Sequence, residues 1–179
     1  DMKELDLREP LREASFLVEV SRPDITFERS FGDKPLKGTF DSRLIAQAFG
    51  NVIKNASEAM EGIERSGGTA NAIRIRAERQ GDSIRVDVID NGKGLPREHR
   101  QRLLEPYMTT RDKGTGLGLA IVKKIVEDHG GHLELHDAPA EFYGGRGAMI
   151  SMILPASTAT PNESSAPSSK ETEKVDNGV

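Results

Sequence analysis

The segment between residues 90 and 118 constrains the fold most, because it places two glycine-rich turns at the ends of a long polar connection. The first turn, Asp90–Gly94, directly follows a run over 83–89 that is typical of a buried strand, and the second, Gly114–Gly118, directly precedes a helical pattern. A connection longer than about 12–15 residues with little to pack is typical of a lid or a disordered stretch. The segment therefore predicts a nucleotide pocket under a mobile cover. The expected hinges of this cover are Gly92, Gly94, Gly114 and Gly116.

Apolar periodicity along the rest of the chain predicts an α+β domain. Helices are predicted over 5–20, from 42 to the glycine-rich stop at 66–68, and over 117–129, and residues 96–104 are compatible with a short charged helix. Strands are predicted over 25–29, 73–77, 84–88, 132–136 and 148–154. Gly32, Pro35 and Gly38 are expected in turns, and Asp41 is expected to cap the longest helix. This order predicts helices on one face of a mostly antiparallel sheet.

The composition favours one folded domain followed by a tail. The 179 residues include no cysteine, and a hydrophobic content of 35% with few aromatic residues is enough for one core. A net charge of −4 argues against a general nucleic-acid or membrane-surface binder. No apolar run approaches the roughly 18 residues of a membrane span. Residues 156–179 consist largely of Ser, Thr, Pro, Glu and Lys, which predicts a disordered tail.

Asp90 is a candidate for recognising a nucleobase. Its carboxylate is expected at the end of the sheet, where it would accept a hydrogen bond from an exocyclic amine such as that of adenine. Gly92 and Gly94 would let the backbone approach a flat ring, and Leu95 follows them. The alternative is an ordinary Asp-Asn-Gly turn, which is common in hairpins.

Asn51 and Asn55 are candidates for binding a metal–phosphate group. They lie four residues apart on the longest predicted helix, in a stripe with Glu58 that borders the apolar face. Amide oxygens are neutral, hard ligands that suit a Mg²⁺ whose charge is balanced mainly by phosphates. The alternative is a pair of capping or solvated amides.

The second glycine turn is a candidate phosphate site, because backbone N–H groups and the positive end of a helix dipole meet there. It lacks the Gly-Lys-Ser/Thr ending of a Walker A loop and the spacing of a dinucleotide-binding motif. Arg111 and Lys113 would add positive charge, although the residues alone favour a pair of exposed surface cations.

Taken together and in order, these motifs resemble the ATP-binding catalytic domain of sensor histidine kinases, which share a superfamily with gyrase, Hsp90 and MutL. The resemblance covers Asp41 to Leu154, and the amino-acid sequence of the motifs is most similar to nitrogen-regulation kinases of the NtrY type. Asn51–Ala56 resembles the N box, Asp90–Gly94 the G1 box, Leu104–Thr110 the F box and Gly114–Leu119 the G2 box. Two departures concern Glu58, where many members carry Lys or Arg, and the F box, where Leu104 and Tyr107 replace the usual phenylalanines.

The resemblance implies a two-layer α/β sandwich of the Bergerat type, with ATP held between the long helix, the sheet edge and a flexible lid. It implies that Asp90 binds adenine, Asn55 holds Mg²⁺, Gly116 and Gly118 cradle phosphates, and Asn51 has a catalytic role. The full implied ATP site is Asn51, Asn55, Asp90, Gly92, Gly94, Leu95, Thr109, Thr110, Arg111, Lys113, Gly114, Thr115, Gly116, Leu117 and Gly118.

The expected activity is phosphoryl transfer from ATP to a histidine. In the hydrolase branch a glutamate stands at the position of Asn51, and an amide cannot serve as a general base at neutral pH. None of His99, His129, His132 and His136 has the setting of a phosphoacceptor, so the acceptor is expected upstream of Asp1. The alternatives are an ATPase of the same superfamily and a nucleotide-sensing interaction module that transfers nothing.

The resemblance also sets the expected domains and partners. Residues 1–20 would leave an upstream dimerisation and phosphoacceptor hairpin, and residues 21–155 would form the catalytic domain. The phosphoryl group would pass to the receiver domain of a response regulator. The parent protein would be a homodimeric, inner-membrane-anchored bacterial sensor with this part in the cytoplasm, and the fragment itself a monomer that contacts neither nucleic acid nor the membrane.

Overall fold

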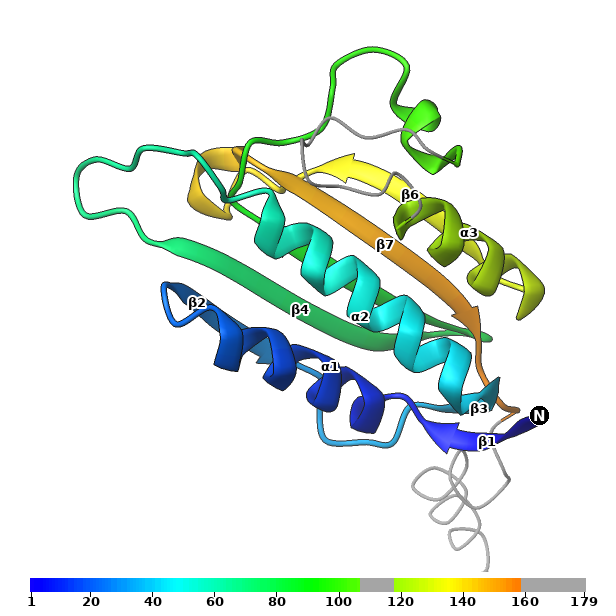
Figure 1. Cartoon of the computed structure of the whole chain (residues 1–179). Helices are drawn as coiled ribbons and strands as arrows, with labels where there is room; N and C mark the ends of the chain where they lie inside the picture. Colours follow the sequence, from blue (N-terminus) through cyan, green and yellow to red (C-terminus); the bar gives the residue numbers. More distant parts are fainter. Residues whose placement is uncertain (107–117, 159–179) are drawn as a thin grey trace, which may run out of the picture.

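The computed structural model describes residues 1–106 and 118–158. In this part of the chain, a mixed sheet of five strands forms one layer of the fold (Figure 1). The strand order is β2-β4-β5-β7-β6; β2 and β4 are parallel, and the other neighbours are antiparallel. The strands are β2 Ile25–Ser30, β4 Asn71–Gln80, β5 Ser83–Asp90, β6 His132–Asp137 and β7 Ala148–Pro155. All five predicted strands are confirmed.

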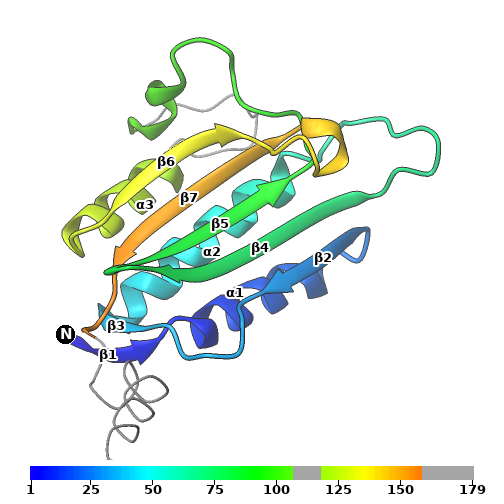
Figure 2. The same cartoon turned by 180° about the vertical axis from the view of Figure 1, so that it is seen from behind.

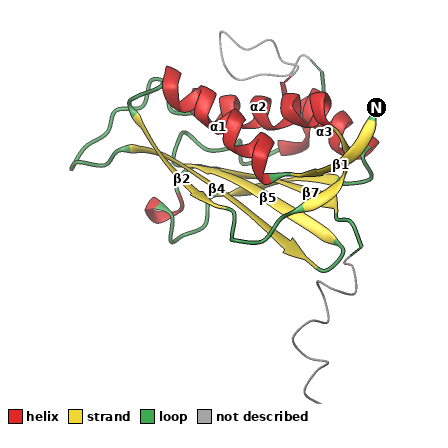
Figure 3. Ribbon diagram, turned by 90° about the horizontal axis from the view of Figure 1, so that it is seen from below, coloured by secondary structure: helices red, strands yellow, loops and turns green. Residues whose placement is uncertain are grey.

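Helices cover one face of this sheet and form the second layer, as Figure 3 shows in side view. They are α1 Arg8–Ser21, α2 Ser42–Glu58 and α3 Gly118–Asp128. The central helix, α2, packs against both α1 and α3, and its apolar face is buried against the sheet. Figure 2 views the sheet from its other face, where the short 3₁₀ helix η2, Tyr143–Gly145, follows the buried Phe142. The expected two-layer α+β architecture is confirmed.

The first helix begins later than the sequence predicts. Residues Met2–Asp6 form β1, which pairs with β3, Lys37–Asp41, in a separate two-stranded sheet within the described residues. The Asp6 carboxylate accepts hydrogen bonds from the backbone N–H groups of Arg8 (3.1 Å) and Leu36 (3.0 Å), so it fixes the start of α1. Gly38, which was expected in a turn, lies within β3. Leu7, Leu11 and Ala14 are buried, and α1 therefore belongs to the same helical layer as α2.

The two ends of α2 differ in how well the sequence predicts them. Asp41 caps the helix as expected, because its Oδ1 accepts hydrogen bonds from the N–H groups of Arg43 and Leu44, both at 3.0 Å. The C-terminal end lies at Glu58 rather than at residues 66–68, and a loop over 59–70 leads into β4. The expected charged helix over 96–104 is reduced to the 3₁₀ helix η1, Arg100–Leu104. Most of the predicted tail, 159–179, lies outside the described residues.

Candidate nucleotide-binding site

The helix α2 presents the two predicted asparagines on one partly exposed stripe. Asn51 and Asn55 are half-buried, whereas their neighbours Val52 and Ala56 are buried in the core between helix and sheet. Their positions one helical turn apart place both side chains along the same edge of the helical layer. Asn55 lies one turn before Ala59, whose N–H donates to the Asn55 carbonyl at 3.1 Å.

Asp90 is the last residue of β5 and is almost completely buried, with 3% of its surface exposed. In the register of the sheet it stands opposite Ile73 of β4 and Ala148 of β7. Its Oδ1 accepts a hydrogen bond of 2.8 Å from the N–H of Gly92. Burial raises the pKa of this carboxyl group to about 6, and the N–H groups of Gly92 and Ala148 and the charge of Arg65 act in the opposite direction. A buried acceptor at a strand end can select a donor on a ligand by hydrogen bonding.

The turn after Asp90 is docked on the end of α2. A Cβ atom at Gly92 would lie 2.4 Å from the carbonyl oxygen of Ala59, a distance that side chains do not adopt. The next residue, Lys93, donates its N–H to the same oxygen at 3.0 Å. The structure therefore brings the predicted acid turn to the end of the helix that carries Asn51 and Asn55, on the helical side of the sheet.

The loop before β7 also lies close to this turn. Gly147 has a φ of +115°, and a Cβ there would lie within 3 Å of the backbone of Asp90 and Asn91. Gly94 has a φ of +84° and lies beside Gly147. Leu95 is half-buried and packs on the main core. Figure 1 shows the loop after α2 and the loop before β7 at the same end of the sandwich.

The other predicted site residues are only partly within the described chain. Gly118 is the first residue of α3, and a Cβ at this position would meet no atom within 4 Å. The glycine is therefore not required there by packing among the described residues. Thr109, Thr110, Arg111, Lys113, Gly114, Thr115, Gly116 and Leu117 lie outside the described residues.

Sequence reasoning missed two residues of this region, Asn91 and Arg65. The Asn91 side chain is fully buried, and its Oδ1 accepts hydrogen bonds from the N–H of Ala72 (2.8 Å) and from Arg65 Nη2 (3.0 Å). Asn91 Nδ2 donates to the carbonyl of Ala70 at 2.8 Å. The sequence Asp-Asn-Gly suggested only a turn residue at Asn91, and Arg65 stands in a glycine-rich stretch without a local signal.

The side chains of Asn51 and Asn55 suit a metal ion that is already bound to the phosphate oxygens of a nucleotide. Within residues 1–106 and 118–158, no group of three or more His, Asp or Glu side chains converges as a metal site would require. Asn51 and Asn55 offer neutral amide oxygens, which fit Mg²⁺ when phosphates supply most of the negative charge. The donor set therefore fits a metal–nucleotide complex better than a resident metal ion.

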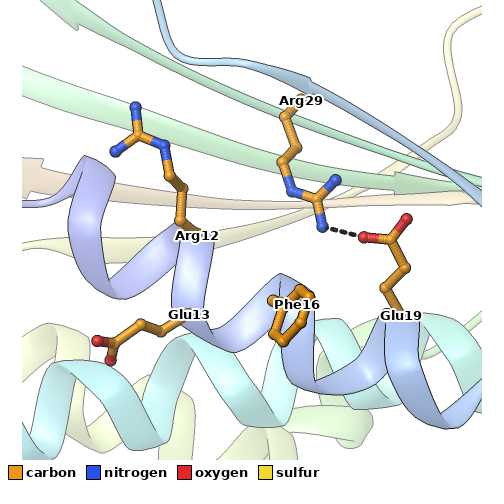
Figure 4. Close-up of a pocket in the computed structure, with 5 residues that line it drawn as sticks. All are labelled: Arg12, Glu13, Phe16, Glu19 and Arg29. Carbon is orange, nitrogen blue, oxygen red and sulfur yellow. Dashed lines mark hydrogen bonds and ion pairs between the residues drawn. The ribbon is translucent and has the colours of Figure 1, made fainter.

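A separate pocket of about 430 Å³ lies between α1 and β2 (Figure 4). It is lined by Arg12, Glu13, Phe16, Glu19 and Arg29. Arg29 Nη2 donates to Glu19 Oε1 at 2.6 Å across it. None of the predicted nucleotide-binding residues lines this pocket, so it is distinct from the site at the end of α2.

The fold and these motifs identify the class of protein. A family model described as histidine kinase-, DNA gyrase B- and HSP90-like ATPase matches residues 40–158. The chain belongs to this family, whose members bind ATP. The matched residues include α2, the Asp90 turn and α3, which are the elements that build the candidate site.

Within the family, the relatives are sensor histidine kinases. The chain is 48% identical over 151 residues to nitrogen regulation protein NtrY of Azorhizobium caulinodans, which covers 84% of this chain but 19% of the relative. A mycobacterial sensor histidine kinase, MprB, shares the fold with a TM-score of 0.76 and 26% identity, covering 89% of this chain and all of that one. The nucleotide-free catalytic domain of histidine kinase ThkA gives a TM-score of 0.73 and 29% identity, covering 87% and 95% of the two chains. The chain is thus a histidine-kinase ATPase domain homologous to NtrY, and it spans about a fifth of that relative's length.

No helix among the described residues is both long and apolar enough to cross a membrane.

Proposed function

We propose that this chain binds ATP with Mg²⁺ at the end of α2 and transfers the γ-phosphoryl group to a histidine on a separate upstream domain. The observation that carries the proposal is the docking of the buried Asp90 turn on the helix of Asn51 and Asn55, through the shared contacts with the Ala59 carbonyl. This contact joins a base-recognising acceptor to a pair of metal-compatible amides at one end of the fold.

Each residue then has a distinct role. Asp90 accepts a hydrogen bond from the adenine amine, Asn55 provides an oxygen to Mg²⁺, and Asn51 orients the phosphates without acting as a base. Gly92, Gly94 and Leu95 border the base, and Gly118 lies at the N-terminal end of α3, where the helix dipole favours phosphate. Arg111 and Lys113 would supply positive charge to the phosphates.

Phosphoryl transfer requires mainly positioning and neutralisation of charge, so this domain needs no nucleophile of its own. The hydrogen bonds of three described histidines support an acceptor elsewhere. His129 is buried with both ring nitrogens engaged, by the Ile125 carbonyl (2.8 Å) and by the Asp41 N–H (3.1 Å). His132 and His136 both contact Glu134, each at 2.9 Å.

The same proposal extends to the partners and location of the parent protein. The acceptor would lie on a dimeric helical hairpin that precedes residues 1–20, and the phosphoryl group would pass from there to a response-regulator receiver domain. The parent would be a homodimeric bacterial sensor anchored in the inner membrane, with this domain in the cytoplasm and monomeric when separate. Nitrogen regulation is the expected pathway, as in NtrY.

The test is phosphotransfer in trans. The chain is mixed with radiolabelled ATP, Mg²⁺ and a separate polypeptide that contains the upstream hairpin of its parent protein. We expect acid-labile, alkali-stable phosphate on the hairpin, none on this chain alone, and strongly reduced labelling with Asp90→Asn. Phosphate release without labelling of the hairpin would identify an ATPase instead, and ATP binding without either reaction would identify a sensing module.

A further inference from the structure

Arg65 links the loop after α2 to the turn that carries Asp90. Its Nε donates to Asn71 Oδ1 at 2.8 Å, at the start of β4. Its Nη2 donates to the Asn91 carbonyl at 2.8 Å and to Asn91 Oδ1 at 3.0 Å, and it contacts Met60 Sδ at 3.5 Å. One guanidinium on a half-buried residue therefore contacts the loop after α2, the beginning of β4 and the turn after β5.

Asn91 transmits this clamp to the site, because it stands between Asp90 and Gly92. Besides its contacts with Arg65, its backbone N–H donates to the Ala72 carbonyl at 3.3 Å, and its side chain bonds the backbone of Ala70 and Ala72. The Gly92 N–H in turn orients the Asp90 carboxylate through its bond to Oδ1. A shift of Asn91 would therefore move the Gly92 N–H that orients the Asp90 carboxylate.

We propose that Arg65 is a positioning residue for nucleotide binding, which fixes the Asp90–Gly92 turn by clamping Asn91 to the loop after α2. The proposal rests on the proposed ATP site but assigns a role to a residue outside the four sequence motifs. Arg65 acts on the ligand through Asn91 and Asp90. It is therefore expected to affect how well the adenine acceptor is presented.

The charge of Arg65 adds to this geometric role. Burial raises the pKa of Asp90, and the positive charge of Arg65 lowers it, which favours the ionised acceptor. Burial lowers the pKa of Arg65 itself, and the neighbouring charge of Arg146 acts in the same direction, while Asp90 opposes both. Arginine is suited to this position because its planar fork reaches Asn71 and Asn91 simultaneously while the charge is retained.

The test is a double-mutant cycle between Arg65 and Asp90, measured as ATP affinity by calorimetry in the full chain. The variants are Arg65→Gln, Asp90→Asn and the double variant, together with Arg65→Lys, which keeps the charge but loses the fork. Arg79→Gln is the matched control, because Arg79 bonds the carbonyls of Gly81 and Ser157 at the other end of β4. Thermal unfolding of each variant without nucleotide accompanies the titrations.

We expect Arg65→Gln to weaken ATP binding roughly three- to thirtyfold in the wild-type background and less than about twofold in the Asp90→Asn background, as for coupled neighbours. Arg65→Lys should show most of the loss of affinity that Arg65→Gln shows, but it should keep the pH dependence of binding. In Arg65→Gln, the pH below which affinity falls should move upward, a change that loss of loop packing alone would not cause.

Equal losses of affinity in both backgrounds, or no loss, would overturn the role of Arg65. A different result tests the proposed ATP site itself. The site is contradicted if the wild-type chain does not bind ATP, or if Asp90→Asn binds ATP with unchanged affinity. A loss in Asp90→Asn with none in Arg65→Gln would leave the site in place and remove Arg65 from it.

Discussion

At the scale of single residues, Asp90 is a carboxylate held in a position that does not favour its charge. Burial raises its pKa to about 6, and the two N–H groups and Arg65 offset this effect only in part. Because the pKa of Asp90 in the folded protein lies above its value of 3.8 in the unfolded chain, the folded protein binds this proton more tightly. The contribution of Asp90 to stability is therefore greatest below about pH 4 and falls as the pH rises through about 6.

Replacement of Asp90 by asparagine should remove this dependence. Without nucleotide, Asp90→Asn is expected to be more stable than the wild type at pH 7.5, by at most on the order of 2–3 kcal/mol. The difference should shrink toward pH 4. Denaturant unfolding of both proteins at several pH values measures it. Because Asp6, Asp24 and Glu134 have lowered pKa values, they give the opposite pH slope, and they cancel in the comparison. A wild type that is more stable at pH 7.5 would contradict this description of Asp90.

At the scale of elements, the contact between the end of α2 and the Asp90 turn decides the geometry of the site. Gly92 allows the backbones to approach closely, and the Ala59 carbonyl accepts the Lys93 N–H at the same point. In contrast, Gly50 lies within α2, and a Cβ there would meet nothing within 4 Å. The two glycines therefore predict opposite responses to the same substitution.

We expect Gly92→Ala to destabilise the protein by about 1–3 kcal/mol, because the added Cβ meets backbone atoms that cannot move aside freely. It should also weaken ATP binding. Gly50→Ala is the matched control and should stabilise the protein by up to about 1 kcal/mol, since it removes a glycine from a helix interior. Thermal and denaturant unfolding measure both effects. Similar stabilities for wild type and Gly92→Ala would show that the turn does not depend on this close approach.

The sequence predicts the elements of this fold where the signal is local. The strands that alternate or are continuously apolar were predicted, as was the cap at Asp41, because burial pattern and capping chemistry act over a few residues. Strand β1 was missed because its side chains are largely exposed and its pairing with β3 is a tertiary contact. The sequence predicts the end of α2 too late, because apolar residues continue into the loop that follows it. Three glycines of this loop, Gly62, Gly67 and Gly68, have positive φ.

The same distinction applies to the site. Asp90, Gly92 and the asparagines of α2 could be proposed as site residues from the sequence because each belongs to a short motif with its own chemistry, and their roles stay predictions. Arg65 could not be proposed in this way, because its proposed role depends on contacts with Asn71 and Asn91 that only the folded chain brings together.

At the scale of the whole molecule, the sandwich places the site at one end, where α2 and β5 both terminate. The sheet fixes Asp90 and the helix fixes Asn51 and Asn55, so the packing of one layer on the other sets the distance between the acid and the amides. We propose that one nucleotide connects Asp90 and Asn55, through its base and its phosphates.

The most direct test is calorimetric titration of ATP in the presence of Mg²⁺ and again in EDTA. Asp90→Asn, which loses a charge-assisted hydrogen bond, should bind ATP about ten- to a hundredfold more weakly under both conditions. Asn55→Ala should lose affinity mainly with Mg²⁺, whereas Gln47→Ala, an exposed amide on the same helix, should change neither value. Unchanged affinity in Asp90→Asn, or equal losses with and without Mg²⁺ in Asn55→Ala, would contradict a shared metal–nucleotide cavity.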